Sequence, residues 1–396
     1  MAIARDTFVN QSKADEALLG DATDGKVHAS DAGAAPEKAA KLTVGGLRKA
    51  LPAHVFEKNL AYSLWYFVVD FSVIFMCLYT YTDDMSLPMY IVYANVLGLF
   101  MWCLFVVGHD CGHNTFSNSK PLNAFMGHIA HGFILVPFWP WAKSHATHHA
   151  FHQNKEKDKS HGWYDREEEG AENIMKDQPF FIPFLYFFVY LLAGYPDGSH
   201  FWPLSPLFNT TRDVIQCIVS GTVVAGFFGG FVWYWGWTNF FWMYFIPWLI
   251  YNFWLYKVTY LQHHGDGTIV YGNEAWDFLT GGLQTIDRVY DTQTGALDSI
   301  MHNITNGHVV HHLFSTSIPH YNLMEATQIL RPHFGNAYKL VRGFPFMELI
   351  QHHWYATRQW MIKREGSGPV YWEFVSQEQY LREKAAVALV EEEEKK

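Results

Sequence analysis

The sequence predicts an all-α integral membrane protein with four transmembrane helices in two hairpins, interfacial helices and a cytosolic histidine-rich cap. Aromatic residues make up 18% of the 396 residues and charged residues only 17%, whereas roughly a quarter of the residues are charged in ordinary soluble domains. Apolar runs of about 20 residues, the length that a helical span needs, recur along the chain. Most of the 22 histidines lie between or after these runs.

The apolar runs differ in how well they suit a membrane crossing. Two of them are expected to lie at the membrane surface: 122–141 carries His128 and His131, and 180–195 is sixteen residues long and contains Pro183. The remaining four are predicted to span the membrane as two hairpins. They are 62–81, 88–107, 214–236 and 240–261.

The distribution of positive charge predicts the orientation. The loops at 82–88 and 237–239, inside the two hairpins, contain no Lys or Arg, whereas Arg48, Lys49 and Lys58 precede the first span. Four more lysines surround the histidine-rich segment after residue 140: Lys143, Lys155, Lys157 and Lys159. The positive-inside rule therefore places both termini and every histidine cluster in the cytosol.

The two ends of the chain are polar. Residues 1–45 are rich in Ala, Gly, Asp and Lys, and we expect a disordered cytosolic leader without a signal peptide. The membrane domain is expected at 46–365, followed by a cytosolic C-terminal tail at 366–396. The net charge of -10 argues against a nucleic-acid partner, and the four cysteines form no CxxC pair, so a disulfide framework is not expected.

Eight histidines form three short clusters, each with helical spacing and close to an apolar segment. The first reads HDCGH, and the other two, HATHH and HVVHH, share the pattern HxxHH. Residues three or four apart lie on one face of a helix, so the imidazoles of a cluster can share a metal ion. The eight are His109 and His113 in the first cluster, His145, His148 and His149 in the second, and His308, His311 and His312 in the third.

Eight imidazoles exceed one coordination sphere, so the clusters predict two metal ions. Imidazole suits iron as well as zinc, but zinc is satisfied by three or four ligands. The sequence contains no HExxH and no Glu-x-x-His, which argues against a zinc protease and a soluble carboxylate di-iron bundle. Neutral imidazoles leave the charge of two iron ions uncompensated, which favours reduction and suits a site that binds dioxygen and attacks a strong C–H bond.

The three clusters, in this order among these spans, resemble the histidine boxes of the membrane fatty acid desaturases. The segments GHDCGHNTFS, PFWPWAKSHATHH, PDGSHFWP, TYLQHH, QTIDR and HNITNGHVVHHLFSTSIPHYNLMEAT look like the methyl-end branch of that family, the delta-12 and omega-3 acyl desaturases. The resemblance runs from LPAHVFEKNL to about residue 330.

The resemblance implies a di-iron cap that uses two electrons and dioxygen to remove two hydrogens from adjacent methylenes of an acyl chain. It implies that the eight box histidines bind iron, with His263 as the ninth ligand and His264 as the alternative. His302 is a further alternative ligand or a residue behind the ligands, and Asp110 is a candidate for orienting a histidine of the first box. The other histidines of the central and C-terminal regions are expected to be solvated or hydrogen-bonded: His128, His131, His152, His161, His200, His320, His333, His352 and His353.

The resemblance also implies partners. We expect a fatty acyl chain as substrate, carried by a phospholipid or a CoA ester, in the endoplasmic reticulum membrane. Because the chain has no HPGG haem-binding motif, cytochrome b5 and its NADH reductase are expected as separate electron donors. Delta-12 desaturation of oleoyl chains is favoured, and omega-3 desaturation is next.

Two alternatives remain open. A sister hydroxylase or acetylenase would use the same two iron ions. A histidine-rich metal transporter would place its ligands at the membrane midplane in broken helices. The predicted spans contain few ionisable groups, namely Asp70 and the near-terminal Lys257, which argues against the transporter.

Overall fold

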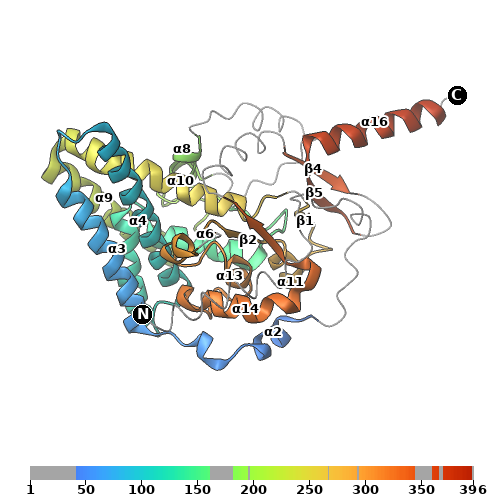
Figure 1. The fold of residues 1–396 in the computed structure, drawn as a ribbon, viewed down its shortest axis with the longest axis horizontal. Coiled ribbons are helices and arrows are strands. Elements are labelled where there is room, and N and C mark those ends of the chain that lie inside the picture. Colours follow the sequence, from blue (N-terminus) through green and yellow to red (C-terminus); the bar gives the residue numbers. More distant parts are fainter. Residues whose placement is uncertain are drawn as a thin grey trace.

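The computed structural model describes residues 42–160, 182–194, 197–265, 267–291, 294–343, 359–364 and 369–394. The protein is mostly helical (Figure 1). Long helices form one end of the molecule, shorter helices form the middle, and a small sheet and a protruding C-terminal helix form the other end. Residues 1–41, most of the predicted leader, lie outside the described residues, as do His161, His352 and His353.

The first long helices form a hairpin that covers the predicted spans 62–81 and 88–107. Two short elements, α2 (Val44–Ala50) and η1 (Ala53–Phe56), precede α3 (Leu60–Thr80) and α4 (Leu87–His113). Asn59 caps α3, because its side-chain oxygen accepts hydrogen bonds from two amides of the first turn. With its 27 residues α4 is about 40 Å long, which is more than the roughly 30 Å thickness of a bilayer's hydrocarbon core.

A second long apolar run, Thr211–Leu261, contains the predicted spans 214–236 and 240–261. It consists of α9 (Thr211–Asn239), a π-helical segment η2 (Phe240–Phe245) and α10 (Ile246–Leu261). Gly236 interrupts the helix with φ 73° and ψ 165°.

The run folds back on itself at Gly236. The rings of Phe231 and Tyr244 lie 4.8 Å apart between centroids, whereas a straight helix would separate these positions by about 20 Å. The two arms of this run therefore pack against each other.

Three shorter helices cover the long ones. They are α5 (Lys120–Phe133), α6 (Phe138–Phe151) and α8 (Ile182–Ala193). The twelve described residues of α8 extend about 18 Å, less than a bilayer crossing needs, and they pack along α10. The contact of α5 with α4 depends on Gly108, because a Cβ there would come within 2.1 Å of the His131 ring.

The outward faces of the long helices are apolar. Trp65 of α3 is 64% exposed and Trp233 of α9 is 86% exposed. Extended apolar surface of this kind is typical of contact with lipid rather than water. The prediction of a mostly helical protein with apolar helices long enough to span a membrane and a histidine-rich region is therefore confirmed.

The all-α prediction needs one correction, because the structure contains two small sheets. In the first, the strand order is β1 (Ile269–Tyr271), β5 (Tyr371–Ser376) and β4 (Gln359–Arg364), all antiparallel. In the second, β2 (Ile286–Val289) pairs in parallel with β3 (Lys339–Arg342). Strands of three to six residues that pair across long stretches of chain leave only a weak pattern in the sequence.

The segment predicted as a C-terminal tail is partly folded. β5 begins at Tyr371, inside the predicted tail 366–396, and pairs with both β1 and β4. The final helix, α16 (Gln377–Glu394), then extends away from the body of the protein (Figure 1).

The remaining short helices surround the third histidine cluster. They are α11 (Phe278–Gly282), α12 (Ala296–Ile300), α13 (His308–Phe314), η3 (His320–Asn322), α14 (Leu323–Phe334) and η4 (Gly335–Ala337). Every residue of α13 is buried, and α13 packs against α11 and α14. The third cluster is therefore enclosed by protein.

Candidate metal centre

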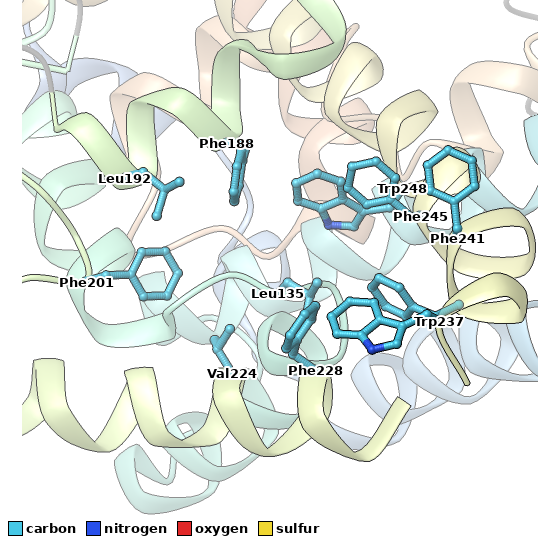
Figure 2. A pocket seen from close by; sticks show the side chains of 11 residues that line it. Leu135, Phe188, Leu192, Phe201, Val224, Phe228, Trp237, Phe241, Phe245 and Trp248 are labelled. Atoms are coloured by element: carbon cyan, nitrogen blue, oxygen red, sulfur yellow. The ribbon is translucent and has the colours of Figure 1, made fainter. Parts of the chain in front are cut away.

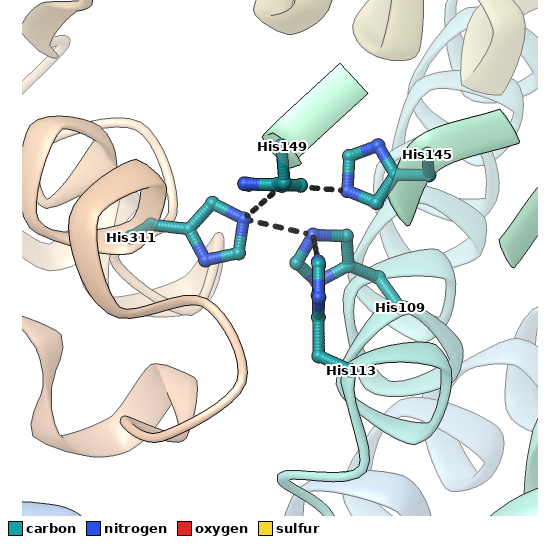
Figure 3. A group of neighbouring side chains, drawn as sticks. All are labelled: His109, His113, His145, His149 and His311. Atoms are coloured by element: carbon teal, nitrogen blue, oxygen red, sulfur yellow. Dashed lines mark hydrogen bonds between the residues drawn. The ribbon is translucent and has the colours of Figure 1, made fainter. Parts of the chain in front are cut away.

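Five histidines from three helices converge on one point (Figure 3). The last turns of α4 supply two of them, α6 supplies two, and α13 supplies one. One nitrogen from each lies within 4.8 Å of the corresponding nitrogen of all the others. This first metal group is His109, His113, His145, His149 and His311.

The ring nitrogens of this group are too close for hydrogen bonding to satisfy them all. The Nε2 atoms form a chain of four contacts, from His113 to His109, His311, His149 and His145, with distances of 3.2, 3.1, 3.1 and 3.0 Å. Each imidazole nitrogen offers either one proton or one lone pair, so at most two of these four contacts can be hydrogen bonds.

The same distances suit a shared metal ion. Two nitrogens that bind one ion at about 2.1 Å and at a right angle lie roughly 3.0 Å apart. A cation between the rings would use all five lone pairs at once. The first metal group therefore fits a metal ion better than it fits a network of hydrogen bonds.

A second metal group lies beside the first. It consists of His148, His152, His263 and His312, all buried, with one nitrogen of each within 4.8 Å of the others. His308 is next to this group, with its Nε2 3.3 Å from Nε2 of His263. Of these two neighbouring histidines, the sequence interpretation preferred His263 as a ligand. His264 is not part of the group, and its ring stacks on that of Tyr260 with 4.0 Å between the centroids.

The two metal groups share helices. Successive residues of a helix point about 100° apart, so adjacent histidines face different sites. In α6, His149 joins the first group and His148 the second; in α13, His311 joins the first and His312 the second. The HxxHH pattern thus serves two neighbouring sites from one helix.

Burial keeps these imidazoles neutral. Burial, followed by the neighbouring imidazoles, lowers the pKa of His149, His311 and His312 well below 6.5. Neutral imidazole is the form that binds metals. Among the described residues, neither ring nitrogen of His312 has a hydrogen-bond partner, although both are buried.

Hydrogen bonds orient two rings in and beside the second metal group. Nδ1 of His148 lies 3.0 and 3.1 Å from the two carboxylate oxygens of buried Asp158. Nδ1 of His308 lies 3.0 Å from the carbonyl oxygen of Ile304. A proton on each Nδ1 leaves the lone pair on Nε2, which could then bind a metal ion.

Asp110, the candidate for orienting a first-box histidine, has a different main partner. Its Oδ1 lies 3.6 Å from Nδ1 of His109, beyond hydrogen-bond range, whereas its Oδ2 lies 2.8 Å from Nδ1 of His320. Oδ2 also accepts a hydrogen bond from the His320 amide. His320 is therefore a buried histidine hydrogen-bonded to Asp110, within the expectation of a solvated or hydrogen-bonded residue.

His302 lies apart from both metal groups. Its Nε2 is 2.9 Å from Oδ2 of Asp70, and with Cys103 these residues form a third buried group. His302 therefore pairs with a carboxylate of α3 instead of joining the clustered histidines.

Most other histidines outside the boxes have local partners or are buried. Nε2 of His128 lies 3.0 Å from Ser220 Oγ, and Nε2 of His131 lies 3.2 Å from the Phe105 carbonyl oxygen. His200 is fully buried, whereas His333 is exposed.

His152 is a member of the second metal group that the sequence interpretation did not place among the candidate ligands. It was expected to be a solvated or hydrogen-bonded loop residue, but it is 2% exposed and belongs to the second metal group. Its spacing of four residues from His148 matches the spacing of His109 and His113, and this signal could have identified it.

An apolar cavity of about 580 Å³ lies among the long helices (Figure 2). Its size is within the range of small-molecule sites. Side chains of α8, α9, η2 and α10 and of neighbouring loops line it, and all are aliphatic or aromatic: Leu135, Phe188, Leu192, Phe201, Val224, Phe228, Trp237, Phe240, Phe241, Phe245 and Trp248. Such a lining suits a hydrocarbon chain and does not suit a charged group.

Comparison with known proteins adds independent information. The family model described as fatty acid desaturase matches residues 86–345. The omega-3 fatty acid desaturase fat-1 of Caenorhabditis elegans is 41% identical over 298 residues, 72% of each chain. The delta(12) fatty acid desaturase fat-2 of the same species is 40% identical over 304 residues, covering 73% of this chain and 78% of the relative.

A bacterial protein is also similar. The sn-1 acyl-lipid omega-3 desaturase (ferredoxin) of Synechocystis is 37% identical over 338 residues, covering 83% of this chain and 90% of the relative. The region that the family model matches includes both metal groups and most of the two helical hairpins.

Proposed function

The chain belongs to the fatty acid desaturase family, and on that basis we propose that it is a methyl-end desaturase, which places a cis double bond in an unsaturated acyl chain. The observation that carries this proposal is the pair of adjacent all-histidine groups, one built around His311 and the other around His312. The relatives named above act at the omega-3 or the delta-12 position. We favour delta-12 desaturation of oleoyl chains, with omega-3 desaturation next.

The reaction consumes a CH2–CH2 unit, one O2, two electrons and two protons, and yields a CH=CH unit and two waters. Two iron ions, one in each metal group, would supply the redox chemistry on dioxygen and the C–H cleavage. The nine predicted ligands remain our proposed set: His109, His113, His145, His148, His149, His263, His308, His311 and His312.

The protein's own residues hold this centre in place and keep bulk water out. Asp158 fixes the ring of His148, and the buried helix α13 brings His308, His311 and His312 to the centre from one side. Exclusion of water protects a site that must cleave an unactivated C–H bond from side reactions.

We propose that the chain crosses the membrane four times, with both termini and the metal centre in the cytosol. The hairpin of α3 and α4 and the fold-back at Gly236 support two pairs of crossings. The 27 residues of α4 extend beyond a bilayer core, which suits a helix whose last turn carries His109 and His113 outside it. The endoplasmic reticulum is the proposed membrane.

The proposed substrate is an acyl chain carried by a phospholipid or a CoA ester. The apolar cavity beside Val224 and Phe228 supports this proposal, because a hydrocarbon chain can fill it without leaving a polar group unpaired. Cytochrome b5 and its NADH reductase are the proposed electron donors, as separate proteins.

Expression in yeast, which makes oleate but no polyunsaturated fatty acids, tests the function. Gas chromatography of total fatty acids, with and without added linoleate, distinguishes the two regiochemistries. A new diene supports delta-12 activity, and a triene from linoleate supports omega-3 activity. Cells that contain the folded protein but form neither product would contradict the proposal.

A further inference from the structure

His152 occupies a specific position in the second metal group. It caps the C-terminus of α6, one helical turn after His148, and it is 2% exposed. The centroid of its ring lies 4.2 Å from that of His312, 4.6 Å from His263 and 5.1 Å from His148. Three proposed ligands of one metal therefore surround this residue.

The first metal group has five imidazoles, whereas the nine proposed ligands leave only four for the second: His148, His263, His308 and His312. We propose that His152 is the fifth imidazole ligand of the second metal, an inference that rests on the proposed di-iron function. With His152 the two metals have matching sets of five nitrogen donors.

Contacts behind His152 hold its ring for this role. Nε2 lies 2.9 Å from the hydroxyl oxygen of buried Thr285. When Nε2 carries the proton and donates it to that hydroxyl, Nδ1 keeps a lone pair that can bind a metal. Thr285 therefore orients His152 as Asp158 orients His148.

The backbone at His152 is also fixed. The indole N–H of Trp276 donates a 2.8 Å hydrogen bond to the carbonyl oxygen of His152. Gly281 permits this approach, because a Cβ there would come within 2.3 Å of the same oxygen. A residue held through both its ring and its carbonyl is built into the site rather than placed there by a loose loop.

His152 and His308 approach the metal position from different elements. His308 comes from α13 and has its Nε2 3.3 Å from Nε2 of His263, whereas His152 follows α6. Loss of His152 should therefore weaken one of the two metal positions and leave the first metal group intact.

The test measures iron binding directly and does not depend on turnover. The wild-type chain and three variants are purified in detergent and loaded anaerobically with ⁵⁷Fe(II). The variants are His152→Ala, Thr285→Val and His264→Ala. Iron per chain, the dissociation constants and the Mössbauer spectrum are then recorded. His264→Ala is the matched control, because His264 is a similarly buried histidine next to His263 that stacks on Tyr260 outside both groups.

We expect two iron ions in the wild type and in His264→Ala. In His152→Ala the affinity for one iron should fall at least about tenfold, and one of the two iron signals in the Mössbauer spectrum should change. Even the loss of a residue that only orients a metal ligand typically lowers metal affinity roughly 10- to 100-fold. Thr285→Val should lower the affinity for the same iron to a smaller extent.

Two results would overturn the inference: unchanged affinities with an unchanged spectrum in His152→Ala, or equal losses at both iron positions. If His152→Ala does not fold, His152→Asn retains a buried polar side chain and is judged by the same criteria. A wild-type protein that binds no iron would instead contradict the proposed di-iron function itself, so the two failures are distinguishable.

Discussion

The rings of His149 and His312 stack with 4.2 Å between their centroids, although each belongs to a different metal group. The contact joins α6 to α13, the two helices that supply histidines to both groups. The two metal groups are therefore direct neighbours, joined by these two helices.

Replacing His311 tests the first metal group. His311 contacts both His109 and His149 through Nε2, so His311→Ala removes the nitrogen that joins α13 to the other two helices. We expect less than one tightly bound iron at this position and a loss of desaturation activity of more than about 100-fold. This loss is larger than the roughly 10- to 100-fold effect typical of residues that only orient a metal ligand. Product analysis and iron determination check this result.

His333→Ala is the control for that experiment, because His333 is exposed and its Nδ1 lies 3.2 Å from the Ile329 carbonyl oxygen within α14. It should retain wild-type product and iron. Full activity in His311→Ala would refute the assignment of the first metal group.

Asp158→Asn tests the carboxylate behind His148. The charged acceptor for Nδ1 is replaced by a neutral one of the same shape, so His148 becomes a weaker ligand. We expect roughly a 10- to 100-fold loss of iron affinity at the second metal. Glu156→Gln removes a nearby exposed carboxylate, and as the matched control it should leave the iron affinity unchanged. Equal iron affinities in the two variants would argue against an orienting role of Asp158.

The metal-free protein should lose stability as the pH falls below about 6.5. Unfolded histidines take up protons near this pH, whereas burial holds the pKa of His149, His311 and His312 well below it. The unfolded state then binds more protons than the folded state, so the free energy of unfolding decreases as the pH falls. Above pH 6.5 the contribution is fully present.

Denaturant unfolding in detergent at pH 7.5, 6.5 and 5.5 measures this dependence. The double variant His311→Gln/His312→Gln lacks two of the depressed groups and should show a smaller decrease. A double variant with the same pH dependence as the wild type would rule out these histidines as its source.

The apolar cavity should control the length of the acyl chain. Val224 lines the cavity, and Val224→Trp would fill part of it. We expect conversion of C18 chains to fall on the order of tenfold relative to C16 chains, since each methylene in an apolar pocket is worth about 1–3 kcal/mol.

Val219→Trp, on the same helix but 40% exposed, adds the same bulk outside the cavity and should preserve the preference. Fatty acid profiles of yeast fed chains of both lengths provide the measurement. Parallel loss on both lengths in Val224→Trp would show that the cavity does not hold the chain.

The fold-back between α9 and η2 should depend on Gly236. This glycine has φ 73°, and no neighbouring atom lies within 4 Å of the position that a Cβ would occupy, so Gly236→Ala adds backbone strain without a clash. With ψ 165° this backbone conformation is one that essentially only glycine adopts, so we expect a loss of roughly 1–3 kcal/mol in the free energy of unfolding.

Gly229→Ala, also without close neighbours but inside the regular helix, should instead add up to about 1 kcal/mol. Thermal unfolding of both variants in detergent compares them. A Gly236→Ala protein as stable as Gly229→Ala would mean that the positive φ at residue 236 is not required.

The sequence alone was sufficient for features that depend on local spacing. The runs at 62–81 and 88–107 carry enough apolar residues to predict α3 and α4, and the HxxHH pattern predicts that His308, His311 and His312 share a helix. These inferences hold because hydrophobicity and helical periodicity are properties of neighbouring residues. The family resemblance followed from the same local motifs.

Only the tertiary structure decided which histidines share a site. His311 meets His109 and His149, and His312 meets His263 and His152, because α4, α6, α10 and α13 pack at particular angles. The pairing of Asp110 with His320 and of β1 with β5 likewise joins distant parts of the chain. Such contacts depend on how separate elements pack in three dimensions, and the local residue pattern does not contain that information.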